Sequence, residues 1–92
     1  MLVELQKLKI ENNGYNRSVS FNRIYVNVDH VVSIADCTSI NDFLLSEGHV
    51  DKKYSLLNLS VGNKIEEIIV VGTSEEVYGR LNKFSKTRLL HD

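Results

Sequence analysis

Apolar and polar residues alternate over most of the first 35 positions, as they do in half-buried β-strands. Within residues 2–10 the alternation changes phase, so the apolar side chains divide between the two strand faces: Val3 and Leu5 on one, Leu8 and Ile10 on the other. We expect a strand with a bulge near Gln6-Lys7, which would return these side chains to one side. A helix is the alternative, since leucine also recurs at every third position.

A hairpin is expected next, because Asn13-Gly14 suits a type I′ turn in which both central residues take positive φ. Beyond it the alternation breaks at Asn22 and again at a turn near Asp29. This leaves three further strand candidates, the last of them rich in β-branched residues: 15–21, 24–28 and 31–35.

Residues 38–53 follow a helical rather than an alternating pattern. Ser39 can cap a short helix and Gly48 can end it, with the apolar positions on one face: Ile40, Phe43 and Leu44. A loop with one hydrophobic plug is the alternative. We call residues 38–53 the inserted segment, because the alternating strands do not require it.

A second hairpin is expected over residues 54–72. Its two strands flank a tight Gly62-Asn63 turn, and residues 68–71 are apolar on both faces. This pattern predicts that residues 65–71 form the central, most buried strand of the sheet.

A C-terminal helix is expected over residues 73–85. Thr73 and Glu76 have the spacing of a capping box, and apolar residues that would pack on the sheet recur at helical spacing: Val77, Leu81 and Phe84. Gly79 costs about 1 kcal/mol relative to alanine inside a helix. We therefore expect a close contact between helix and sheet at Gly79.

Together these elements predict one α+β domain over residues 1–92. Its core is a small antiparallel β-sheet or partly open barrel of about five to six strands, with a short inserted helix and a C-terminal helix. Along the chain the predicted parts are N-terminal strands, inserted segment, hairpin, C-terminal helix and basic tail: 1–37, 38–53, 54–72, 73–85 and 86–92.

Composition narrows the class of protein. Of the 92 residues, 42% are hydrophobic and 25% charged, which excludes a disordered chain. The net charge of −1 lacks the basic excess of a dedicated duplex-binding protein. Cys37 is the sole cysteine, so no internal disulfide can form, and no apolar leader or membrane span is visible. We expect a cytoplasmic protein without membrane association.

Candidate chemistry is sparse. Cys37 could act as a nucleophile beside His30 or His49, but a lone cysteine at a strand end is more often a small buried hydrophobe. Asp29-His30 falls where a turn is expected, and the histidines and the cysteine lack the spacing of metal-ligand pairs. The sequence predicts no enzyme, no cofactor and no metal site.

Basic residues suggest a second class of function. Four of them and no acidic residue fall between Arg80 and His91. With the exposed aromatic residues Tyr15 and Tyr25, they could form a surface for nucleic acid or another anionic partner. That surface would need most of the basic side chains on one face: Arg17, Arg23, Lys52, Lys53, Arg80, Lys83, Lys86 and Arg88.

Three segments, 25–34, 56–64 and 69–77, resemble parts of the small FlbD-type proteins associated with flagella and swarming, and similar segments occur in uncharacterised phage-encoded proteins. The chain differs from that family at Val28, where the family usually has proline, and in the inserted segment and a longer N-terminal hairpin. The resemblance implies a small cytoplasmic β-sheet protein with a C-terminal helix that acts by binding. It supplies no catalytic residue.

We therefore expect a non-enzymatic protein-interaction or regulatory module of bacterial or phage origin. Copies should self-associate, because a small sheet leaves open edges, and the partner would be a protein, including a host protein in the case of a phage. Nucleic-acid binding through the C-terminal helix and tail is the alternative. The candidate partner-binding residues, the first two provided that they are exposed, are Phe43, Leu44, Lys52, Lys53, Arg80, Lys83, Lys86 and Arg88.

Overall fold

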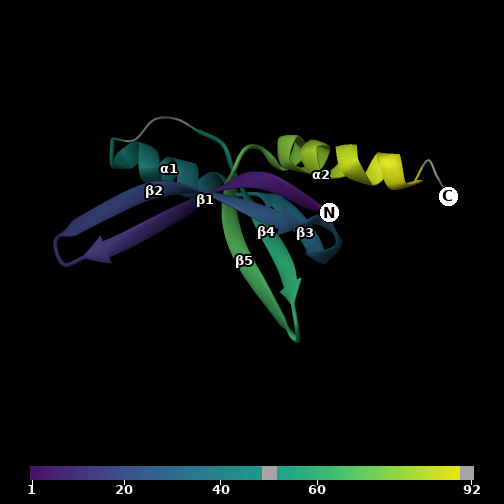
Figure 1. Cartoon of the computed structure of the whole chain (residues 1–92). Coiled ribbons are helices and arrows are strands. Elements are labelled where there is room, and N and C mark those ends of the chain that lie inside the picture. The colour runs from purple at the N-terminus through teal and green to yellow at the C-terminus, as the bar shows by residue number, and fades with distance from the viewer. Residues whose placement is uncertain (49–51, 90–92) are drawn as a thin grey trace.

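The computed structural model of the protein describes residues 1–48 and 52–89, with side chains described as far as Lys83. Within these residues the chain forms five antiparallel strands, a short 3₁₀ helix and two α-helices, which confirms the α+β class (Figure 1). The elements are β1 (Leu2–Asn13), β2 (Asn16–Asn27), η1 (Val28–His30), β3 (Val31–Asp36), α1 (Thr38–Ser46), β4 (Tyr54–Val61), β5 (Lys64–Val71) and α2 (Ser74–Leu89).

The strands form one open sheet in the order β2-β1-β5-β4-β3. β5 lies at its centre, as its apolar sequence predicted, but it is not the most buried strand, because β4 has three buried residues and β5 has two. β1 and β5 pair where Lys7 lies opposite Val70, and beyond that pair the two strands separate. Figure 1 shows the result: the β1–β2 hairpin and the β4–β5 hairpin leave this junction in different directions.

The predicted bulge in β1 is wrong. The register between β1 and β2 runs without a shift from Leu2 opposite Asn27 to Asn13 opposite Asn16. The change of phase instead buries each half of β1 on a different face of the sheet. Val77 of α2 packs in the same cluster as Val3 and Leu5, whereas Leu44 of α1 packs with Leu8.

β2 is likewise one strand rather than two. Asn22 lies within its unbroken register, so the predicted break there is a change of buried face and not an interruption. The turn before β2 also differs from the prediction. Its central residues are Gly14 and Tyr15; Gly14 has φ +63°, and no described residue other than glycine has positive φ. This pattern is typical of a type II′ turn with glycine first, not of type I′.

The inserted segment forms α1, but the helix begins earlier than predicted. Cys37, not Ser39, occupies the N-cap position, and its side chain makes no capping hydrogen bond. The end of the helix agrees with the prediction. Gly48 has φ +86°, and its N–H donates to the C=O of Leu45 at 3.0 Å.

α2 begins as its capping pattern predicted. The N–H of Glu76 donates to Oγ1 of Thr73 at 3.1 Å. The helix continues to Leu89, so residues 86–89 belong to it and not to a tail. The contact expected at Gly79 is absent among the described residues, since a Cβ built there meets no atom within 4 Å. The prediction that Phe84 packs on the sheet concerns a side chain outside the described part of the chain.

Two hydrogen bonds fix the start of α2 to the sheet. The N–H of Ser74 donates to Oδ1 of Asp36, at the end of β3, at 2.8 Å. The backbone and hydroxyl groups of Ser74 both stabilise the carboxylate, which lowers the pKa of Asp36. The hydroxyl of fully buried Ser55 donates to the C=O of Gly72 at 2.7 Å. Neither α1 nor the described length of α2 is long and apolar enough to cross a membrane.

Candidate functional site

The two apolar anchors predicted in the inserted segment are not free surface. Leu44 is fully buried against Leu8 and Tyr54, so the condition that it be exposed is not met. Phe43 is half-buried, and the guanidinium of Arg17 lies over its ring, 4.9 Å from the centroid. Both residues hold α1 on the sheet, because the helix needs an apolar face to dock.

Basic residues of the predicted site also serve this docking. Arg17 on β2 pairs with the carboxylate of Glu47, at the end of α1. Nζ of Lys52 lies over the ring of Phe21, 4.2 Å from the centroid, and its backbone N–H donates to Oδ1 of Asn41 at 3.0 Å. The second half of the inserted segment is therefore fastened to the β1–β2 hairpin at Glu47 and at Lys52.

The remaining basic residues do not join Arg17 and Lys52 on one face. Arg80 and Lys83 are exposed on α2, whose buried residues pack in a different cluster from those of α1. Lys53 is exposed before β4, and the side chains of Lys86 and Arg88 lie outside the described residues. Within the described part of the chain, Arg17 and Lys52 thus lie against α1 and its following segment, whereas Arg80 and Lys83 lie on α2, and Arg23 borders the same cleft as Arg80.

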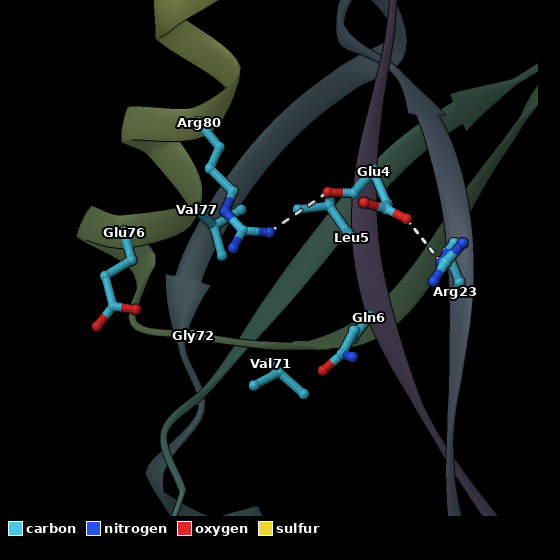
Figure 2. Close-up of a pocket in the computed structure, with 9 residues that line it drawn as sticks. All are labelled: Glu4, Leu5, Gln6, Arg23, Val71, Gly72, Glu76, Val77 and Arg80. Atoms are coloured by element: carbon cyan, nitrogen blue, oxygen red, sulfur yellow. Dashed lines mark hydrogen bonds and ion pairs between the residues drawn. The ribbon is translucent and has the colours of Figure 1, made fainter.

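A cleft of about 330 Å³ opens where β1 separates from β5 beneath α2 (Figure 2). Nε of Arg23 on β2 lies 2.6 Å from Oε1 of Glu4, and Arg80 of α2 reaches the backbone C=O of Glu4 at 3.4 Å. Figure 2 shows Arg80 pointing into the cleft, whereas Glu76 points away from it. The Glu4 carboxylate thereby neutralises Arg23, whereas Arg80 bonds to an uncharged backbone carbonyl.

The groups considered for catalysis lie apart. His30 borders a shallow groove with Leu59 and Val61, whereas Cys37 borders a hollow between the first turns of the two helices. His49 falls outside the described residues. In residues 1–48 and 52–89 no group of three or more histidine, cysteine, aspartate or glutamate side chains is placed to hold a metal ion.

The outer edge of β2 is the most extended unpaired feature of the sheet. Residues of an antiparallel strand alternate between directing both backbone groups at a neighbour and directing both away. The N–H of Val28 donates to the C=O of Met1 at 3.0 Å, so even-numbered residues of β2 face β1 across the shared register. The odd-numbered residues direct their N–H and C=O outward: Arg17, Val19, Phe21, Arg23 and Tyr25.

The opposite edge of the sheet, β3, is protected in ways that β2 is not. β3 has 6 residues, its register shifts between Val31 and Ser33, and α2 lies alongside it. Short length, bulges and covering helices are the usual means of blocking edge pairing. β2 has 12 residues and an unbroken register, and the chain contains no proline. In the described part of the protein, nothing pairs with its outer edge.

Apolar side chains accompany this edge. Phe21 is 38% exposed and Tyr25 is 61% exposed, and both belong to the outward-directed set. We call the backbone edge of residues 17–25, with these two side chains, the β2 edge. Sequence reasoning expected an open edge but did not identify which strand supplies it. Two features of the sequence could have indicated β2: its long alternation, and the absence of proline and lysine in residues 16–27. Neither feature shows that β2 is outermost, because that depends on the order of the strands in the sheet.

The segments that carry the FlbD-type resemblance lie at the junction from β2 to β3, at the β4–β5 hairpin and at the step from β5 to α2. Comparison with the models of known protein families, with curated proteins and with solved structures gives no match for this chain.

Proposed function

We propose that this protein is a non-enzymatic protein-interaction module that binds an extended protein segment as an added strand at the β2 edge. The observation that carries the proposal is the row of outward backbone groups on β2, which has neither a bulge nor a paired strand among the described residues. Strand addition uses such a row directly: backbone hydrogen bonds supply affinity, and alternate side chains supply specificity.

The energetics suit binding of moderate strength. A net backbone hydrogen bond contributes about 0.5–1.5 kcal/mol, so a row of several can offset the cost of ordering an extended segment. Phe21 and Tyr25 add partly exposed aromatic surface beside the row. The separation of Cys37 from His30 into different hollows supports a binding role over a catalytic one.

Nucleic-acid binding is the weaker alternative. A nucleic-acid surface needs unpaired positive charge gathered on one face. Arg17 and Arg23 are each paired with a glutamate, and Arg17 and Lys52 also lie over phenyl rings. A light-scattering mass that falls after nuclease treatment or at raised salt would favour this alternative, because phosphate contacts are strongly salt-dependent.

The proposal can be tested with a displayed library of random extended peptides and two variants at Tyr25. Tyr25→Pro removes an outward N–H and keeps the β1–β2 bonds, whereas Tyr25→Ala removes the side chain and keeps that N–H. Selected peptides should shift the amide resonances of β2, lose most of their affinity for Tyr25→Pro and retain most of it for Tyr25→Ala. Peptides that bind both variants equally, or a library that yields none, would contradict the proposal.

A further inference from the structure

We infer that the segment added at the β2 edge is β2 of a second copy of this chain, antiparallel to the first, with the two-fold axis at Phe21. The inference rests on the proposed function and names the partner at that site. Pairing of this kind would join two five-stranded sheets into one continuous sheet. Such an interface is isologous, so it closes at a dimer and leaves no further β2 edge exposed.

The backbone of β2 is self-complementary about Phe21. Outward-directed residues must face outward-directed residues if both strands are to exchange hydrogen bonds. An axis at Phe21 satisfies this for the whole row, with the following pairs across the axis: Arg17 with Tyr25, Val19 with Arg23, and Phe21 with itself. Each outward N–H and C=O in residues 17–25 then has a partner.

Neighbouring registers are less favourable. An axis at Ser20 would place Arg17 directly opposite Arg23, and like charges directly opposite one another destabilise a pair of strands. An axis at Asn22 would place Arg17 opposite Asn27. That asparagine ends the strand, and its Oδ1 accepts the N–H of Asp29 as the chain enters η1. The backbone groups of Arg17 would then face a turn instead of a strand.

The two arginines of the edge favour a second copy over an acidic partner, although Lys52, whose amine lies over the Phe21 ring, brings a positive charge close to the axis. Arg23 pairs with Glu4 at 2.6 Å, and Arg17 pairs with Glu47. An acidic peptide or a nucleic acid would have to compete with these carboxylates for both arginines. A second copy brings its own neutralised arginines, and the closest arginines of the two strands would be diagonal neighbours, about 7–8 Å apart.

The side chains of the outward row add to the backbone bonds. Phe21 would meet its own symmetry mate at the axis, where aromatic pairs contribute about 0.5–1.5 kcal/mol beyond their buried area. Arg17 would lie opposite Tyr25, which is 61% exposed in the single chain. A guanidinium beside a tyrosine ring is a favourable cation–π arrangement.

Amide hydrogen exchange on the full chain tests the pairing, with β2 as its own control. Amides of even-numbered residues bond to β1 and should exchange slowly at every concentration. Amides of Val19, Phe21 and Arg23 should be protected at high protein concentration and lose protection, by tenfold or more, on dilution below the dimer dissociation constant. Rapid exchange of these amides at a concentration where light scattering shows a dimer would overturn the inference.

Disulfide trapping tests the register. In a Cys37→Ser background, Phe21→Cys places two cysteines opposite each other at the axis, whereas Ser18→Cys places them about 20 Å apart at the usual rise per residue. The first variant should form a covalent dimer at least tenfold faster than the second. A faster link through Asn22→Cys, or equal rates for all three variants, would overturn this register.

The two tests separate this inference from the proposed function. A monomer at all concentrations that still binds library peptides at the β2 edge would overturn the second copy as occupant and leave strand addition intact. A dimer whose hydrogen exchange maps to another surface, with no peptide bound at the β2 edge, would overturn both.

Discussion

Lys7 of β1 lies opposite Asn22 of β2, and at this pair the apolar positions of both strands change face. Lys7 is also the residue of β1 that pairs with β5, opposite Val70. On one side of the junction α2 covers the apolar residues of the hairpin, and on the other side α1 covers those of the opposite face. Two polar residues, Lys7 and Asn22, therefore mark the position along the hairpin where the buried face changes from the one under α2 to the one under α1.

The dual-faced core predicts a large difference between neighbouring leucines of α1. Leu44 is fully buried, whereas Leu45 is 43% exposed. Leu44→Ala should lower the free energy of unfolding by about 2–5 kcal/mol, because it leaves a cavity between α1 and the sheet. Leu45→Ala should change it by no more than about 0.5 kcal/mol. Urea unfolding at fixed protein concentration measures both, and equal losses would show that α1 does not dock through Leu44.

Replacement of two glycines by alanine should change the stability of the fold in opposite directions. Gly72 has φ +120°, a backbone conformation that residues with a side chain rarely adopt, so Gly72→Ala should destabilise the fold by about 1–3 kcal/mol. Gly79 lies in α2 with open space around it, so Gly79→Ala should stabilise by about 0.5–1 kcal/mol. Thermal unfolding compares the pair. A destabilising Gly79→Ala would show that the glycine serves a contact of another kind.

The bond from Ser74 to Asp36 predicts a pH dependence. Hydrogen bonds from Ser74 lower the pKa of Asp36 in the folded state, so its ionised form stabilises the fold above the unfolded pKa of about 3.9. That contribution is lost as the pH falls through the lower folded pKa. Asp36→Asn should therefore lower the melting temperature at neutral pH, and the gap to the parent protein should close in strong acid. A gap that stays constant across this range would mean that the charge of Asp36 does not hold α2.

Local patterns predicted most elements because local chemistry decides them. Thr73 and Glu76 define the start of α2 whatever lies around them, and the Gly62-Asn63 turn needs only its own residues. The bulge near Gln6 was wrong for a non-local reason. A change of phase in a strand has two explanations, a bulge or a second buried face, and the choice depends on where both helices dock.

The candidate site was less predictable for the same reason. Phe43 and Leu44 have apolar character that suits an anchor or a core, and packing against β1 and β4 decides for the core. Arg17 and Arg23 suggested free positive charge, but their glutamate partners come from other elements of the fold. The identity of the edge strand depends on the pairing of β1 with β5, which no short segment encodes.

Neutralisation of Arg23 by Glu4 should control the strength of the proposed dimer. Glu4→Gln leaves Arg23 without its carboxylate, near the diagonally placed Arg17 of the second copy. At about 8 Å in water two unit charges repel by about 0.5 kcal/mol, and the two-fold axis generates this contact twice. The dimer dissociation constant should therefore rise by up to about fivefold at low salt.

A matched variant and a salt series separate this effect from a structural one. Glu11→Gln breaks the ion pair with Lys9 on the inner strand β1, 2.9 Å in length, and should leave the dissociation constant unchanged. Sedimentation equilibrium at low and high salt measures both variants. At about 1 M salt the Debye length falls to about 3 Å, so the defect of Glu4→Gln should disappear. A defect that persists there would mean that Glu4 supports the sheet itself, because screening removes charge repulsion but not a lost contact.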